Sequence, residues 1–155
     1  MAKQKKFFMK IPFSYKNIHF CEAVVLACID FRFWRETIKF VEDELGIASY
    51  DFPQMPGASK AINDCQGETD VPFQCVGVSC NLHHAARVVI VNHADCGAYG
   101  GSKEFSGDDE AEQKFHEVQL KSAREKILKY YPGKEVILAY AKLVDGGENI
   151  EFILV

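Results

Sequence analysis

The chain has 155 residues, of which 48% are hydrophobic and 26% are charged, and its formal net charge is −4. This length and composition predict a single folded domain over residues 1–155 and exclude a disordered or collagen-like chain. The mildly acidic balance gives no reason to expect a nucleic-acid partner. Apolar runs such as residues 24–29 are too short to cross a membrane, so no membrane partner is expected.

The N-terminal residues 1–20 are predicted to be an arm rather than a targeting signal. Their apolar residues are interrupted by Lys10 and Pro12, whereas a secretory signal has an unbroken apolar core. We therefore expect a reducing, cytoplasmic location. In that compartment the six cysteines are expected to be buried thiols or metal ligands rather than disulfides.

The first structural elements follow the arm directly. Residues 22–28 form an unbroken aliphatic run, which predicts a strand buried on both faces. Residues 49–52 predict a short strand, and the prolines and glycine of residues 53–57 predict a turn. Between the two strands a helix is expected, with Gly46 as its stop. Its apolar stripe has the spacing i, i+4, i+7 and i+11 and consists of Trp34, Ile38, Val41 and Leu45.

The middle of the chain alternates again between helical and extended patterns. Residues 63–71 are interpreted as a polar loop, residues 73–86 as a weaker helix and residues 87–91 as a second buried strand. Asp108 or Asp109 is expected to cap a long helix that ends near Tyr130. The apolar stripe of this helix is Leu120, Ala123, Ile127 and Tyr130.

Two further strands are expected at the C-terminal end. Residues 135–143 predict the third long strand, residues 145–147 a turn, and residues 150–155 a terminal strand. Strands that alternate with helices predict an α/β fold. We expect a mostly parallel central sheet flanked by helices, with room for an antiparallel edge.

Two short polar motifs follow directly after the two strongest strands. Cys28 and Asp30 come after the first, and His93 and Cys96 come at the end of the second. Ligands in open α/β sheets collect beyond the carboxyl ends of the strands, so the two motifs face each other if the strands are neighbours. Two thiols and one imidazole form a ligand set that zinc favours, and three protein ligands leave a fourth position open, as in catalytic sites. The alternative is a pair of buried core thiols.

The segment after the first strand also brings a charge pair. Residues 28, 30 and 32 of an extended segment project to the same side, so Arg32 can hold Asp30 in its ionised form through a bidentate pair. Asp30 can then orient a water at the metal, or it can swing inward and become the fourth ligand. The alternative is an ion pair with a purely structural role.

In this order, C-x-D-x-R after one strand and H-x-x-C-G after another resemble the β-class carbonic anhydrase family. The chain is most similar to a short carbonic-anhydrase-like branch with a P-G-[GA] turn, here residues 56–58, and a D-C-G-A-Y-G segment, here residues 95–100. The resemblance extends over residues 22–143. It implies zinc on Cys28, His93 and Cys96 and an Asp30–Arg32 dyad.

The resemblance also implies an activity and an assembly. The activity is the reversible hydration of CO₂ to bicarbonate by zinc hydroxide, so CO₂ and bicarbonate are the expected small-molecule partners. The assembly is a homodimer or a higher oligomer with its active sites near the subunit interface.

Three features depart from the family pattern. Phe31 stands where the family usually has serine, Met55 and the P-G-A turn replace an R-N-A-G segment, and residues 62–71 look like an insertion. Two alternatives therefore stay open. One is a COS or CS₂ hydrolase on the same scaffold, and the other is a zinc-binding protein without turnover.

Other cysteines and histidines are interpreted as structural. Cys75, Cys80, His83 and His84 form a C-x₄-C-x₂-H-H group near Cys65 that fits no established zinc spacing. Val76, Cys80 and His83 or His84 would share one face of a helix, so a buried helix face is expected rather than a second metal site. His116 is four residues from Glu112, so the two are expected to pair on a helix surface.

Overall fold

A computed structural model describes residues 9–155 of the chain and contains a five-stranded sheet in the order β2-β1-β3-β4-β5. Strands β1 to β4 run parallel to their neighbours, and β5 runs antiparallel to β4. The sequence-based prediction of a mostly parallel sheet with an antiparallel edge is therefore confirmed. The strands are β1 (Ala23–Ala27), β2 (Tyr50–Asp51), β3 (Arg87–His93), β4 (Glu135–Val144) and β5 (Asn149–Leu154).

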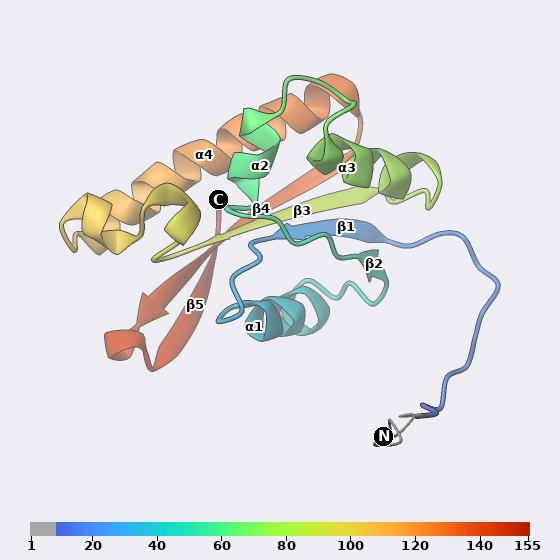
Figure 1. The fold of residues 1–155 in the computed structure, drawn as a ribbon, viewed down its shortest axis with the longest axis horizontal. Coiled ribbons are helices and arrows are strands. Elements are labelled where there is room, and N and C mark those ends of the chain that lie inside the picture. The colour runs from blue at the N-terminus through green and yellow to red at the C-terminus, as the bar shows by residue number, and fades with distance from the viewer. Residues whose placement is uncertain (1–8) are drawn as a thin grey trace, which may run out of the picture.

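Helices cover both faces of this sheet (Figure 1). One face carries α2 (Ser59–Asp64), α3 (Val71–Asn81) and α4 (Asp109–Tyr130), and the other carries α1 (Trp34–Lys39). Side chains alternate along β1, so Val24 and Leu26 join the core beneath α2, α3 and α4, whereas Val25 joins the core beneath α1. Burial on both faces is why β1 is an unbroken aliphatic run.

The predicted stripe of the first helix is only partly correct. Val41 is buried, but Trp34, Ile38 and Leu45 are half-buried, and the side chains that reach the core lie one position earlier at Phe33, Thr37 and Phe40. Phe33 packs against His93 at the start of the helix, so the buried face begins one position earlier than predicted. Helix α1 then continues as a π-helical turn, Phe40–Glu44. A π-helical turn holds more residues than an α-helical one, so a stripe extrapolated at 3.6 residues per turn is out of phase beyond it, at Leu45. Gly46 has a φ of 62°, as expected of a helix stop.

Helix α2 was not predicted, and α3 is shorter than predicted. Helix α2 has six residues, too few for a clear apolar periodicity, and it owes its stability to packing of the buried Ile62. The predicted polar loop over residues 63–71 therefore begins only after α2 ends. Helix α3 begins with Pro72 in its first turn and ends at Asn81, so the histidines that follow lie in a turn outside the helix.

The long helix α4 starts as predicted, but its buried face extends further than predicted. The Asp108 carboxylate accepts hydrogen bonds from the backbone amides of Glu110 and Ala111, which makes Asp108 the N-cap. The expectation that His116 and Glu112 pair on the surface is wrong, because both side chains are buried. The reason is that Leu120 continues the same face, and this face packs on the sheet along the whole helix.

Residues 9–20 of the arm lie without helix or strand and extend away from the sheet (Figure 1). The remaining residues of the predicted arm, 1–8, lie outside the described residues. Within the described part of the chain, no helix combines the length and hydropathy that a membrane crossing requires.

Candidate active site

The carboxyl ends of β1 and β3 meet, because these strands are parallel neighbours with Ala27 opposite Val91. Cys28 follows β1 directly, His93 is the last residue of β3, and Cys96 lies three residues further. All three are buried, and their donor atoms lie within 4.8 Å of one another. The two sulfur atoms of Cys28 and Cys96 are 3.8 Å apart. The structure thus brings together the three residues that the sequence singled out.

The imidazole of His93 is fixed so that one nitrogen faces the two thiols. Its Nδ1 lies 2.7 Å from the carbonyl oxygen of Ala94, which places the ring proton on Nδ1. Its Nε2 is buried and has no hydrogen-bond partner among the described residues. Phe33 stacks on the ring with centroids 4.1 Å apart. Burying a nitrogen lone pair without a hydrogen-bond partner costs free energy of folding, unless a ligand binds that nitrogen.

These atoms fit the coordination shell of a zinc ion. Tetrahedral zinc with bonds of about 2.3 Å to sulfur places two thiolate ligands roughly 3.8 Å apart, which equals the separation of the Cys28 and Cys96 sulfurs. The unpartnered Nε2 of His93 supplies a third donor on the same side. The residues present therefore suit the metal that the resemblance implies.

The two thiols ionise very differently in the absence of a cation. The hydrogen bond from Cys96 holds the pKa of the Cys28 thiol far below its ordinary value, helped by the backbone amide of Gly57, 3.4 Å from the sulfur. The same hydrogen bond and burial raise the pKa of Cys96, which therefore keeps its proton. A divalent cation between the sulfurs removes the like-charge penalty and favours two thiolates.

Asp30 and Arg32 form a tight bidentate pair beside the metal-binding atoms. Arg32 Nη2 donates to Asp30 Oδ2 at 2.6 Å and Arg32 Nε donates to Oδ1 at 3.0 Å. These hydrogen bonds hold the pKa of Asp30 at about 2, so the carboxylate is ionised at neutral pH. Asp30 Oδ2 lies 4.0 Å from His93 Nε2. Asp30 is therefore held by Arg32 and is adjacent to the three donors without belonging to their cluster.

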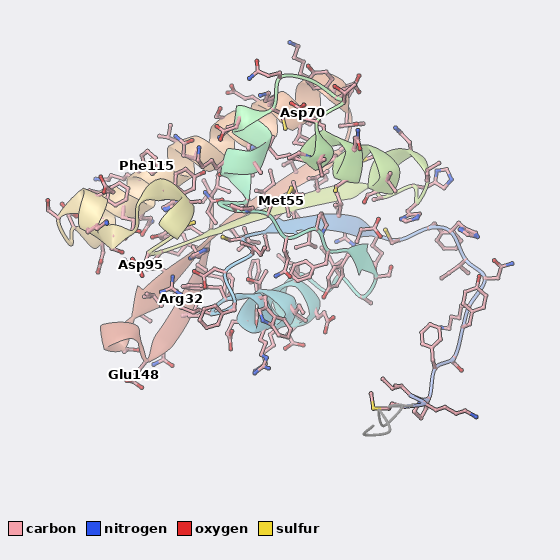
Figure 2. The ribbon with its side chains drawn as sticks, viewed as in Figure 1. Arg32, Met55, Asp70, Asp95, Phe115 and Glu148 are labelled. Carbon is pink, nitrogen blue, oxygen red and sulfur yellow. The ribbon has the colours of Figure 1, made fainter. Side chains whose placement is uncertain are left out.

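Arg32 also binds a second carboxylate, which the sequence analysis did not assign. Its Nη1 donates to Asp95 Oδ2 at 3.0 Å, and its Nη2 donates to the Asp95 carbonyl oxygen at 3.1 Å. Figure 2 shows Arg32 and Asp95 close together at this end of the sheet. Arg32 thus links the loop after β1 to the loop that carries Cys96. Asp95 lies inside the D-C-G-A-Y-G segment, and its place in that motif was the only sequence feature that could have indicated a role for it at the site.

A buried carboxylate on α4 supports the same loop. Glu112 accepts a hydrogen bond from the backbone amide of Asp95 at 2.8 Å and another from the Ser102 hydroxyl at 2.7 Å. His116, one turn later, contacts the Asn92 side chain through Nδ1 at 3.1 Å, and burial lowers its pKa to about 4. Through these contacts helix α4 fixes the position of the loop between His93 and Cys96.

The P-G-A turn lies against the first thiol. The Met55 amide donates to the Ala27 carbonyl oxygen at 2.9 Å, which continues the pairing with β1 beyond the end of β2. Gly57 has a φ of 75°, and a Cβ there would lie 3.1 Å from Ala98 Cβ and 2.8 Å from Lys60 Cβ. Glycine is therefore required by both conformation and space. The departure at Phe31 places a ring that is 82% exposed next to Asp30.

The remaining cysteines and histidines fall into two groups. Val76 and Cys80 lie on a buried face of α3, as predicted, and Cys65 is buried as well. All six cysteines are free thiols. The prediction is wrong for the histidines, because His83 and His84 both lie beyond the end of α3, His84 is exposed and His83 contacts Asp51.

Comparisons with solved structures agree with the fold. The β-carbonic anhydrase isoform I of Trichomonas vaginalis superimposes with a TM-score of 0.56, covering 93% of this chain and 88% of the other at 15% identity. The β-carbonic anhydrase CafA of Aspergillus fumigatus gives a TM-score of 0.56, covering 89% of this chain and 76% of the other at 16% identity. At such low identity these similarities establish the fold alone.

Sequence comparisons give the family. An uncharacterized protein of Rickettsia conorii is 29% identical over 127 residues, covering 78% of this chain and 67% of its own length. An uncharacterized protein of Rickettsia bellii is 27% identical over 126 residues, covering 78% of this chain and 76% of its own length. Residues 18–151 match the family described as "Putative carbonic anhydrase". The match spans most of the chain, so this protein belongs to that carbonic-anhydrase-like family.

Proposed function

We propose that the protein is a zinc-dependent enzyme that hydrates CO₂ reversibly to bicarbonate and a proton. One observation carries the proposal. Two buried thiols and an unpartnered imidazole nitrogen converge within 4.8 Å at the ends of β1 and β3, directly beside an arginine-bound carboxylate. Family membership supports the same reaction.

In this proposal Cys28, His93 and Cys96 hold the zinc ion. Zinc supplies Lewis acidity that makes hydroxide available near neutral pH. Two anionic thiolates weaken that effect because they donate charge to the metal, so further groups must orient the nucleophile. In this proposal the neighbouring Asp30–Arg32 pair meets that requirement.

Asp30 is proposed to orient the attacking oxygen. Its pKa of about 2 leaves an ionised acceptor at every pH at which the enzyme would operate. A carboxylate next to His93 Nε2 can accept the proton of the nucleophile in a hydrogen bond and direct a lone pair at the carbon of CO₂. The product proton leaves to buffer.

Arg32 is proposed to keep Asp30 from becoming a metal ligand. It donates to both oxygens of Asp30 while it is itself held by Asp95. For Asp30 to bind the metal, these charge-assisted hydrogen bonds would have to break. This arrangement favours turnover over the alternative of a zinc protein whose fourth position is closed by Asp30.

A stopped-flow assay of CO₂ hydration tests the proposal. The protein should be loaded with zinc, its metal content measured on the same sample, and Cys96→Ser used as the matched control. We expect hydration well above the uncatalysed rate for the wild type, and loss of activity and of the zinc ion held by Cys28, His93 and Cys96 in the variant. A fully loaded protein with no rate enhancement from mildly acidic to mildly alkaline pH would contradict it. COS and CS₂ should then be tested with the same sample.

We further propose that the protein assembles with copies of itself through its arm. Residues 9–20 expose large apolar side chains, among them Met9, Ile11, Phe13 and Phe20. A cavity of about 970 Å³ lies between α1 and β5 and has Arg32 among its lining residues. Exposed apolar segments of this kind are typical of chains that bury them against a partner.

A further inference from the structure

A second cluster of metal-binding side chains lies at the opposite end of β1. Cys21, Asp51 and His83 are half-buried, and their donor atoms lie within 4.8 Å of one another. Cys21 and Cys28 are separated by seven positions along extended chain, a distance of roughly 23 Å. The cluster is therefore distinct from the candidate active site.

Three elements that are distant in the sequence build this cluster. Cys21 precedes β1, Asp51 belongs to the edge strand β2, and His83 follows α3. The Cys21 amide donates to the His83 carbonyl oxygen at 2.9 Å, which fixes the two backbones beside each other. Because no two of these residues are close in sequence, no spacing motif reveals them.

Their side chains converge on one carboxylate oxygen. His83 Nδ1 lies 2.7 Å from Asp51 Oδ2, the Ser79 hydroxyl donates to the same oxygen at 2.6 Å, and the Cys21 sulfur lies 3.8 Å from it. A thiol, an imidazole and a hydroxyl surround one anion. A cation bound there can displace the thiol proton and accept the Nδ1 lone pair of the neutral imidazole, whose proton then lies on Nε2.

The donor set selects the kind of cation. Calcium and magnesium prefer shells made of oxygen, whereas a thiolate, an imidazole and a carboxylate together suit zinc. A zinc ion bonded to one thiolate and one carboxylate has no net charge at the site. Ligand atoms around tetrahedral zinc lie roughly 3.3 to 3.8 Å apart. The 3.8 Å between the Cys21 sulfur and Asp51 Oδ2 already lies in that range. The 2.7 Å between His83 Nδ1 and Asp51 Oδ2 must lengthen by less than about 1 Å to reach it.

The surroundings leave space for that adjustment and for the ion to enter. The side chains of His83 and Asp51 are 35% and 34% exposed. Both also line a surface pocket of about 470 Å³. Solvent in this pocket, or the Ser79 hydroxyl, can complete the fourth position. We propose that Cys21, Asp51 and His83 form a second zinc site, which fastens the two-residue edge strand β2 to the start of β1 and to the end of α3.

Counting zinc tests this proposal with a matched pair of variants. Wild type, His83→Asn and His84→Asn are dialysed against the same buffered micromolar zinc and analysed by mass spectrometry of the metal. His84 is the control because it is the adjacent histidine and is exposed, with a φ of 54° that asparagine tolerates. We expect two zinc ions per chain in the wild type and in His84→Asn, and one in His83→Asn.

A Cys96→Ser variant separates this site from the candidate active site. It should retain one zinc if the second site exists, whatever happens to CO₂ hydration. In that variant, cobalt should give the near-ultraviolet charge-transfer band of a single thiolate ligand, and adding Cys21→Ser should abolish it. Equal zinc content in wild type and His83→Asn, or a cobalt spectrum that survives Cys21→Ser, would overturn the proposal. If His83→Asn fails to fold, Cys21→Ser with Cys65→Ser as control replaces it in the count.

Discussion

At the scale of single residues, Arg32 connects two acidic side chains from different strand ends. Asp30 follows β1 and Asp95 follows β3, and the guanidinium donates to both. The arginine thereby orients the carboxylate and also fixes the two loops that carry the proposed metal ligands. In the proposed reaction Asp30 orients the nucleophile, so a change of its charge should lower the rate of hydration.

Replacing Asp30 with asparagine should lower CO₂ hydration by roughly a hundredfold or more, because the neutral amide has one acceptor oxygen instead of two and lacks the charge that orients the nucleophile. Zinc content should stay unchanged, since Asp30 lies outside the cluster of three donors. Stopped-flow rates and metal analysis of the same samples check both statements. Asp43→Asn, an exposed carboxylate of the same type on the π-helical turn, should keep wild-type activity. Equal activity of Asp30→Asn and Asp43→Asn would remove Asp30 from the mechanism.

His116 should make the fold sensitive to mild acid. Burial lowers its pKa from 6.5 to about 4, so the unfolded chain binds a proton more readily than the folded one. Its stability contribution is therefore complete above the unfolded pKa of 6.5 and is lost as the pH falls from there toward 4. Between about pH 7 and pH 5, the wild type should lose roughly 2 kcal/mol more unfolding free energy than His116→Gln.

Urea unfolding at both pH values, in the presence of a chelator so that metal loss does not contribute, measures that difference. An equal loss in the two proteins would mean that His116 is not held neutral. The sequence alone favoured a surface position for this residue, because a histidine four residues from Glu112 is typical of a pair on a helix surface. Only the packing of α4 on the sheet decides it. In contrast, Cys28, His93 and Cys96 were predictable, because Cys28 directly follows one strongly apolar strand, His93 ends another, and Cys96 lies only three residues beyond it.

At the scale of elements, the turn between β2 and α2 leaves no room for a side chain at Gly57. Gly57 has a φ of 75°, a Cβ added there would lie within 3.3 Å of Lys60, Ala98 and Tyr99, and its amide reaches the Cys28 sulfur. This turn therefore connects the conformation of the P-G-A segment to the candidate metal ligands.

The variant Gly57→Ala should lower the unfolding free energy by about 2 kcal/mol or more, because backbone strain and steric overlap add. Gly46→Ala is the matched control. Gly46 has a φ of 62° but no atom within 4 Å of an added Cβ, so only the conformational cost of about 1 kcal/mol applies. Urea unfolding of the two variants gives the comparison. If Gly46→Ala proves as costly as Gly57→Ala, the close contacts contribute nothing.

The elements differ in how well their sequences predict them. Strands β1 and β3 and helix α4 are long and strongly patterned, and Asp108 marks the helix start as predicted. Helix α2 has six residues, and the π-helical turn changes the periodicity inside what reads as one helix. Both depend on tertiary packing, which local pattern does not report.

At the scale of the whole molecule, the N-terminal arm is the feature that indicates an assembly of more than one chain. Its described part, residues 9–20, has no helix or strand, and Phe13 is 84% exposed. The resemblance to the β-class family predicts an oligomer, but one chain alone cannot provide the partner surface that would bury these side chains.

Deleting residues 1–20 should therefore convert the protein from a homodimer or larger assembly to a monomer, because the apolar contact area of the arm is lost. Light scattering coupled to size-exclusion chromatography measures the molar mass of both forms. Circular dichroism checks that the shortened chain keeps its sheet. A wild type that is already monomeric at concentrations used for the assay would refute the proposed assembly.

The most direct test of the whole account is anomalous X-ray diffraction from a crystal grown with zinc, with data collected above and below the zinc absorption edge. We predict an anomalous peak bonded to the Cys28 sulfur, His93 Nε2 and the Cys96 sulfur, with Asp30 still paired with Arg32. An anomalous map without a peak among those three atoms, in a crystal that contains zinc, would contradict the proposed metal centre and the chemistry assigned to it.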